Sequence, residues 1–317
     1  MGRYVLRRVL QALPLLALVS VGSFLILKLA PGGPLAAYEA NPDVTAADLE
    51  RLRQAFGLDE PLPLQYLSWA GRFVVGDWGY SFAYHQPVLE LIAERLPNTI
   101  YLMGTVYLLT LVLALPIGIF VAVRQYSWLD NLVTSATFAF LSTPTFWLGL
   151  LLIMVFGLQL RWFPLGAMAT PDKPFDVIDR LHHLVLPVLT LALVGIGGYT
   201  RYLRTSMLET INQDYIRTAW AKGLTERGVV LRHALKNAAI PLVTVAALDV
   251  PDLFVGALVT EQIFGWPGMG RLFWDAATRY DFPVLMGILA VSSGLIVMAN
   301  LFADVVYGYL DPRIRYT

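Results

Sequence analysis

The sequence predicts an all-α polytopic membrane protein with six transmembrane helices, and three observations support this fold class. Hydrophobic residues make up 57% of the 317 residues, and charged residues only 15%. With a mean hydropathy of +0.61, the chain is too apolar for a soluble protein of ordinary composition. The apolar residues also gather into six segments, each near the roughly 20 residues that a helix needs to cross the hydrocarbon core.

The overall charge and the cysteine content exclude some functions. Basic and acidic residues both number 23, so net charge gives no sign of a nucleic-acid partner. The chain has no cysteine and can form neither disulfides nor thiolate metal sites.

The first predicted transmembrane helix covers residues 9–30, and Lys28 is its only charged residue. Arg3, Arg7 and Arg8 precede it. A secretory signal peptide also starts with basic residues, but its apolar part is only about 7–15 residues long and leads to a small-residue cleavage site. We therefore expect a retained helix whose N-terminus lies inside the cell.

Residues 31–97 have a different character and predict a small external subdomain after the first helix. They are rich in glycine, proline, acidic and aromatic residues. Thr45 can cap an amphipathic helix whose apolar residues recur at helical spacing, namely Leu49, Leu52 and Phe56. Together with the first helix, this subdomain forms an N-terminal domain, residues 1–97.

The second predicted domain, residues 98–317, holds the other five helices, at about 98–123, 129–160, 184–200, 238–260 and 282–307. Six spans place both termini on the same side of the membrane. The positive-inside rule identifies that side as the cytoplasm. Besides the segment between the fourth and fifth helices, the basic residues on this side are Arg3, Arg7, Arg8, Arg124, Arg313 and Arg315.

The segment between the fourth and fifth helices, residues 212–237, is basic and predicts two short helices that meet at a corner. Asp214 can cap the first helix, and Gly223 can end it because glycine readily adopts positive φ. Thr225 can cap the second helix, with Glu226 in its first turn. An ordinary basic cytoplasmic loop has the same composition, and the residues alone favour that simpler interpretation.

A resemblance changes this interpretation. The segment resembles the coupling loop of binding-protein-dependent ABC transporter permeases, whose pattern is Glu-Ala-Ala, three residues and Gly. Arg-Thr-Ala in place of Glu-Ala-Ala departs from the general pattern but is similar to dipeptide and oligopeptide permeases. The resemblance implies a set of residues that couple to the ATPases: Asp214, Arg217, Thr218, Ala219, Lys222, Gly223, Leu224, Glu226 and Arg227.

Other motifs resemble the same peptide permease subfamily. The stretch EQIFGWPGMGRL, residues 261–272, is similar to its outer-end signature through Glu261, Gly265, Pro267, Gly268 and Gly270. RLPNT, RYDFPV and NLFADVVYGYLDPRIR match as well, at residues 95–99, 279–284 and 300–315. These motifs are spread over nearly the whole chain, so their joint occurrence is a specific sign of this subfamily.

The resemblance implies the permease subunit of an importer in the cell (inner) membrane. This subunit would form a heterodimer with a homologous permease subunit and receive di- or oligopeptides from an external substrate-binding protein. Two cytoplasmic ATPase subunits would bind ATP and Mg, so this chain would need no cofactor of its own. Members of the subfamily also carry nickel chelates, glutathione or oligosaccharides, and the binding protein largely selects among them.

The residues themselves argue against catalysis by this chain. The nearest match to a phosphate-binding loop, residues 265–272, has Arg271 and Leu272 where lysine and serine or threonine are required. His182 and His183 are adjacent, which is poor spacing for a shared metal on a helix. We therefore expect no catalytic residue and no metal site.

Two carboxylates near the middle of the fifth predicted helix need an explanation. Asp249 and Asp252 are three residues apart, hence on one helix face, with Pro251 between them. A charge at the membrane centre costs about 2.5–3.5 kcal/mol on translocon scales, so both should face protein or water. They could attract the cationic group of a substrate, or pair with Arg or Tyr of a neighbouring helix. As a proton relay they would instead indicate an ion-coupled secondary transporter.

Overall fold

The computed structural model describes residues 2–29, 33–39, 43–255 and 257–310. Every regular element in these ranges is a helix, apart from one isolated bridge between Tyr80 and Pro87. The described residues contain five helices long and apolar enough to cross a membrane, or six if one bent pair counts as a single span. The all-α fold with about six spans, predicted from the apolar segments, is confirmed.

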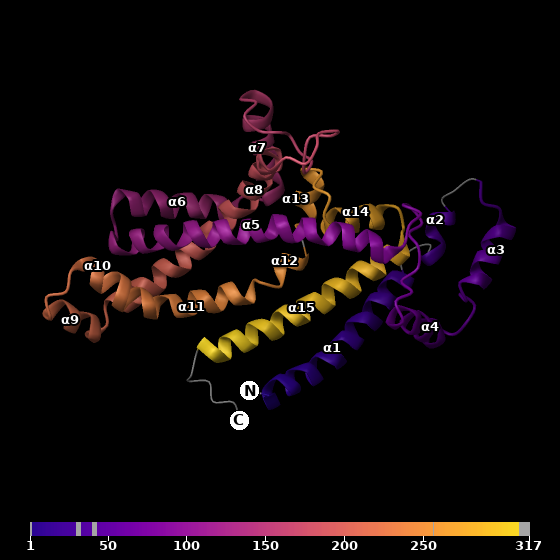
Figure 1. Ribbon diagram of the computed structural model, residues 1–317, viewed down its shortest axis with the longest axis horizontal. Coiled ribbons are helices and arrows are strands. Elements are labelled where there is room, and N and C mark those ends of the chain that lie inside the picture. The colour runs from indigo at the N-terminus through magenta and orange to yellow at the C-terminus, as the bar shows by residue number, and fades with distance from the viewer. Residues whose placement is uncertain (1, 30–32, 40–42, 256, 311–317) are drawn as a thin grey trace.

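Four of the candidate spans lie in single α-helices, which are α1 (Gly2–Leu29), α5 (Val88–Val123), α8 (Val177–Ile211) and α15 (Phe282–Leu310). The fifth candidate, Glu226–Phe254, joins several shorter elements. Helix α1 packs against α15, and α5 packs along α8 (Figure 1). The predicted end of the first helix at residue 30 lies outside the described residues, as do Arg313, Arg315 and the end of the NLFADVVYGYLDPRIR motif.

Two of these helices are longer than predicted. Helix α5 begins at Val88 rather than at residue 98, and Pro97 lies within it instead of ending the preceding segment. Helix α8 covers residues 177–211 rather than 184–200. Its ends carry polar residues such as Asp179 and Glu209, which continue the helix beyond the apolar segment.

The third predicted span, residues 129–160, is not one straight helix. It consists of α6 (Trp128–Ser142), α7 (Thr145–Leu152) and the π-helix η2 (Ile153–Gln159), with a bend of 106° between α6 and α7. Pro144 has no N–H to continue the helix, and it disfavours helical geometry at Thr143, whose ψ is 125°. The prediction of an unbroken helix was therefore wrong here.

The fifth predicted span, residues 238–260, is also interrupted. Helix α11 (Leu235–Leu248) ends at Asp249, and the short α12 begins at Asp252. The expectation of a continuous helix through both aspartates was thus wrong, because the chain turns through Pro251 between them, but both side chains line the same cavity. The remaining short helices of this region are α12 (Asp252–Val255), α13 (Leu258–Ile263) and α14 (Met269–Thr278).

The segment after α1 holds η1 (Gly33–Leu35), α2 (Ala36–Glu39), α3 (Ala46–Ala55) and α4 (Leu62–Val74). As predicted, Thr45 caps α3, and it forms a capping box with Asp48. Asp281, which belongs to the RYDFPV motif, attaches this segment to the core. Its buried carboxylate accepts hydrogen bonds from the Ser81 hydroxyl and, at 3.0 Å, from the Ala83 N–H.

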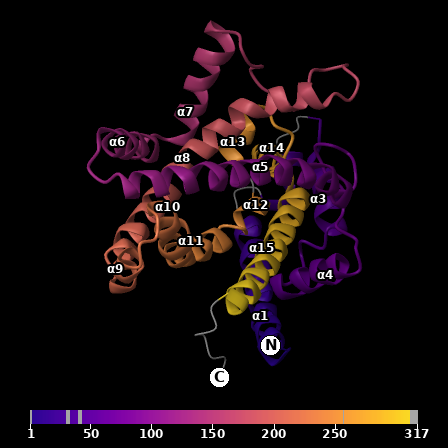
Figure 2. The same cartoon turned by 60° about the vertical axis from the view of Figure 1, so that its left-hand side comes forward.

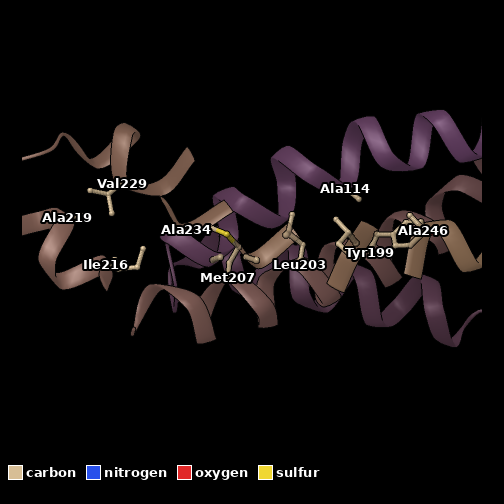
Figure 3. Close-up of a cluster of buried hydrophobic side chains, with 12 residues drawn as sticks. Ala114, Tyr199, Leu203, Met207, Ile216, Ala219, Val229, Ala234 and Ala246 are labelled. Carbon is tan, nitrogen blue, oxygen red and sulfur yellow. The ribbon is translucent and has the colours of Figure 1, made fainter. Parts of the chain in front are cut away.

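The molecule is elongated, and its two ends differ. Helices α9 (Asp214–Ala221) and α10 (Glu226–Gly228) lie at one end, and α2 and α3 lie at the other (Figure 1). Figure 2 shows α9 and α3 on opposite sides as well. Helices α5, α8 and α11 run between the two ends (Figure 1). A buried apolar cluster joins these helices to α9 (Figure 3).

Candidate functional site

Helix α9 begins one residue earlier than the sequence suggested. Gln213 is its N-cap, and Asp214 is its first helical residue. The prediction that Asp214 caps the helix was therefore wrong, although a carboxylate in the first turn still favours the helix dipole. Asp214 lies 3.7 Å from Arg217, and both side chains are exposed, so this ion pair adds little stability.

The corner between α9 and α10 depends on Gly223, as predicted. Its φ is +74°, a conformation that side chains of L-residues rarely adopt. Its N–H donates to the carbonyl of Trp220 at 2.9 Å, which closes the end of α9 after the C-cap Lys222. Thr225 then caps α10, where its hydroxyl accepts from the N–H of Gly228 at 3.3 Å.

One face of α9 is held firmly by the core. Ile216 is 1% exposed and Ala219 is 5% exposed, and both belong to the buried cluster that includes Val229 and Met207 (Figure 3). Ala219 therefore anchors the helix from beneath and does not lie on its outer surface. The opposite, exposed face of α9 carries Asp214, Arg217 and Thr218. The other predicted coupling residues are exposed on the corner and on α10, and they are Lys222, Gly223, Leu224, Glu226 and Arg227.

Two more contacts fix this end of the molecule. The amide of Asn237 on α11 donates to the Tyr215 hydroxyl on α9 at 2.9 Å. The π-helix η3 (Val229–Ala234) continues α10 directly into α11. The corner at Gly223 is therefore joined to the fifth predicted span without an intervening loop. A force on the exposed face of α9 would therefore reach α8 and α11 through packed side chains.

An ion pair that the sequence analysis missed joins α8 to α6. The guanidinium of Arg204 donates two hydrogen bonds of 2.7 Å to the carboxylate of Asp130, which is buried. Asp130 also accepts from the N–H of Tyr126 at 2.8 Å. The available signal was an acidic residue inside a predicted span, which requires a partner.

We expect Asp130→Ala to lower the free energy of unfolding by about 3–5 kcal/mol, because it leaves the charge of Arg204 without its partner. Thermal melting of the purified protein measures this change. The double variant Asp130→Leu with Arg204→Met should recover most of the loss, since it removes both charges. A single variant as stable as the original chain would contradict this role.

Asp249 and Asp252 line a cavity of about 460 Å³ between α5, α8, α11 and α12. The Tyr199 hydroxyl of α8 donates to the carboxylate of Asp249, as in the alternative in which an aspartate pairs with Arg or Tyr of a neighbouring helix. Tyr107 of α5 donates to the carbonyl of Ala246 at 2.7 Å, near the break after α11. Besides the two aspartates, Arg201 is the only charged residue among those that line this cavity in the described part of the chain.

The outer-end signature and the RLPNT motif form one buried junction. Glu261 is completely buried and accepts from the Thr99 hydroxyl at 2.9 Å and from the Arg271 N–H at 3.0 Å. Thr99 in turn accepts from the Met269 N–H at 2.7 Å. Burial raises the pKa of the Glu261 carboxyl, while the hydrogen bonds act in the opposite direction.

The glycines of this junction are required by close contacts. A Cβ on Gly268 would lie 2.4 Å from a carboxylate oxygen of Glu261, and one on Gly270 would lie 2.6 Å from the Cα of Leu258. Gly265 has a φ of +60°, and its carbonyl accepts from the Arg271 guanidinium at 2.7 Å. Pro267 accepts from the amide of Asn98 at 2.9 Å. The motif therefore ties α13 and α14 to α5.

The histidine pair has ordinary structural partners. A ring nitrogen of His182 is 2.7 Å from the carbonyl of Trp162, and one of His183 is 2.7 Å from the carbonyl of Gly166. Within the ranges that the structure describes, no three His, Cys, Asp or Glu side chains come together as a metal site would require.

Comparison with known proteins agrees with this architecture. Residues 114–316 match the family model of the binding-protein-dependent transport system inner membrane component, and residues 1–103 match the model of its N-terminal part. In a solved structure of the MetNI methionine ABC transporter in inward-facing conformations, one chain has a similar fold, with a TM-score of 0.56. The similarity covers 70% of this chain and 97% of that one, at 16% identity.

Full-length relatives are also known. The chain is 44% identical to the oligopeptide transport system permease protein AppB of Bacillus subtilis (strain 168), over all of both chains. It is 37% identical to the probable peptide ABC transporter permease protein y4tP of Sinorhizobium fredii, again over all of both chains. The resemblance first drawn from the coupling loop is confirmed, and the chain belongs to the family of binding-protein-dependent transport system inner membrane components.

Proposed function

We propose that this chain is a permease subunit of an ABC importer for di- or oligopeptides. It forms the translocation pathway together with a homologous permease subunit. An external substrate-binding protein delivers the peptide, and two ATPase subunits supply the energy from the cytoplasm. The peptide permease relatives, similar to this chain over its entire length, support the substrate class.

The energy-coupling part of the proposal rests on one observation, which is that α9 and the turn at Gly223 are packed against the core on one side and exposed on the other. Helix α9 presents an exposed outer face, while Ile216 and Ala219 fix its inner face to the core. A surface that transmits mechanical force from a partner subunit must be accessible to that subunit on one side and packed tightly against its own protein on the other. We therefore assign the outer face of α9 and the corner to ATPase docking, with both termini on the same cytoplasmic side.

The cavity beside Asp249 is the proposed part of the pathway in this subunit. Two carboxylates and the guanidinium of Arg201 line it, which gives a formal charge of −1 when all three are ionised. A peptide with free termini carries an ammonium group and a carboxylate, and this arrangement complements both. The hydroxyl of Tyr199 holds the carboxylate of Asp249 at the cavity wall.

We expect Asp249→Asn with Asp252→Asn to lower uptake of peptides that have a free N-terminus by about tenfold, which corresponds to a loss of about 1.4 kcal/mol. N-acetylated peptides, which lack the ammonium group, should be affected much less. Uptake into vesicles that contain the complete transporter measures both. Tyr199→Phe serves as the control, because it removes the hydrogen bond to Asp249 and keeps the carboxylate. Equal effects on free and acetylated peptides would exclude charge recognition here.

An ion-coupled secondary transporter is the alternative that uses the same two aspartates. It requires uptake that collapses with an uncoupler and survives ATP depletion. The proposed importer requires the reverse. Measuring peptide uptake under each treatment separates the two mechanisms.

A further inference from the structure

A second cavity lies between α1, α4 and α15, away from the proposed pathway. Its volume is about 430 Å³, within the roughly 300–1,000 Å³ of small-molecule sites. Both α1 and α15 are candidate membrane spans. The cavity therefore lies where the surroundings of the chain are hydrocarbon. Figures 1 and 2 both show α4 beside α1.

The walls of this cavity offer apolar surface and hardly any free polar groups. The Ser20 hydroxyl donates to the Ala17 carbonyl at 2.9 Å and is 2.7 Å from the Tyr66 hydroxyl. The Ser293 hydroxyl donates to the Leu289 carbonyl at 2.6 Å. The hydroxyls of Ser20 and Ser293 therefore have partners in the chain. The Ser23 hydroxyl and the Trp69 indole N–H also line the cavity and make no hydrogen bond within the described residues. What is left for a ligand is mainly aliphatic and aromatic surface, which suits a hydrocarbon chain.

Helix α4 itself has three distinct faces. Tyr66, Trp69, Ala70 and Phe73 form the first face, which lines the cavity. The second face is apolar and points away from the chain, with Leu64 and Leu67 that are 52% and 61% exposed. Val75, the C-cap residue that follows α4, is 80% exposed. The third face is a narrow polar strip, where Arg72 donates to the Ser68 hydroxyl at 3.2 Å.

This division is typical of a helix that lies in a membrane boundary, with its apolar side in the lipid and its polar side toward water. Leu67 and Ser68 are neighbours in sequence but point about 100° apart on the helix. In water, the second face would expose several large apolar side chains in one stripe, which soluble surfaces avoid. Tyr66 and Trp69 are also the aromatic types that gather at membrane interfaces.

We propose that α4 is an interfacial membrane helix and that the groove beneath it holds one acyl chain of a phospholipid. The lipid completes the packing between α1 and α15, which would otherwise leave apolar surface uncovered. Arg72, exposed on the polar strip of α4, supplies the positive charge for the lipid phosphate. This site is independent of the pathway and of the coupling corner.

The position of α4 can be tested by spin labelling, because the chain has no cysteine. Leu67→Cys and Ser68→Cys each carry one nitroxide in the complete transporter, with partner subunits free of cysteine, in nanodiscs of phosphatidylethanolamine and phosphatidylglycerol. We expect the label at position 67 to collide several-fold more with oxygen, and the label at position 68 to collide more with a water-soluble nickel chelate. Equal access of the chelate to both labels would place α4 in water and overturn the proposal. Shielding of both labels from both reagents would mean that a protein partner covers α4, and would overturn it too.

Occupancy of the groove can be tested by counting bound lipids. Ala70→Trp fills the groove from α4, and Gly294→Leu fills it from α15, where a Cβ would meet nothing within 4 Å. Native mass spectrometry of the complex should show one retained phospholipid fewer for each variant that assembles. Ser68→Trp adds the same side chain on the polar strip and should leave the count unchanged. A lipid count that is the same in all of these variants would overturn the proposal.

Discussion

Replacing Gly223 with valine is expected to lower transport at least tenfold while the chain stays in the membrane at normal abundance. Its φ of +74° strains any β-branched residue, by about 1–3 kcal/mol. A Cβ added at this position would meet nothing within 4 Å, so within this chain the effect comes from backbone conformation and not from a clash. Uptake assays together with quantification of the inserted chain measure both quantities.

A series at the same position provides the control. Asparagine adopts the left-handed conformation more readily than other side chains, so Gly223→Asn should retain most of the transport. Alanine should lie between asparagine and valine. If the valine variant transports as fast as the original chain at equal abundance, the corner has no role in energy coupling.

Replacing Gly270 with alanine is expected to destabilise the fold by about 1–3 kcal/mol, the usual cost of overpacking a tight core. The new Cβ would lie 2.6 Å from the Cα of Leu258 and 2.9 Å from its nitrogen. Both are backbone atoms, which cannot move aside as a flexible side chain can. The junction of Glu261 with Thr99 would have to open to make room.

Thermal melting of the purified protein measures this loss. Gly104→Ala is the matched control, because Gly104 lies within α5 and its Cβ would meet nothing within 4 Å. That variant should melt at the original temperature or slightly above it, since alanine favours a helix over glycine. Equal melting of the two variants would show that the junction is not tightly packed.

The positions of the spans were predictable from the sequence, and the breaks within them were not. Apolar segments of spanning length fix the existence of the helices. Prolines do not determine where these helices end. Three of them, Pro116, Pro187 and Pro241, lie inside continuous helices, whereas Pro144 and Pro251 lie at interruptions. The local chemistry is the same in each case. Packing against neighbouring helices decides whether the chain bends, and a single sequence does not contain that information.

In the candidate site, too, features set by residues close in sequence were predictable, and contacts between residues far apart in sequence were not. The corner at Gly223 and the cap at Thr225 were predicted because each depends on residues only a few positions away. The contact of Glu261 with Thr99 joins residues 162 positions apart, and no spacing rule indicates it. Similarly, the inward direction of Ala219 depends on how α9 rests on the core. The motifs identified both partners of the junction, but only the structure brings them together.

Cross-linking from the outer face of α9 tests the proposed energy coupling most directly. Thr218→Cys, with a photoreactive group attached to this otherwise cysteine-free chain, is placed in the complete transporter in its native membrane. We expect it to capture an ATP-hydrolysing subunit, whereas the same group at Asp48→Cys, at the opposite end of the molecule, should not. Capture of no nucleotide-hydrolysing neighbour from position 218, or labelling of that cysteine by a reagent confined to the outside of the cell, would contradict the proposal.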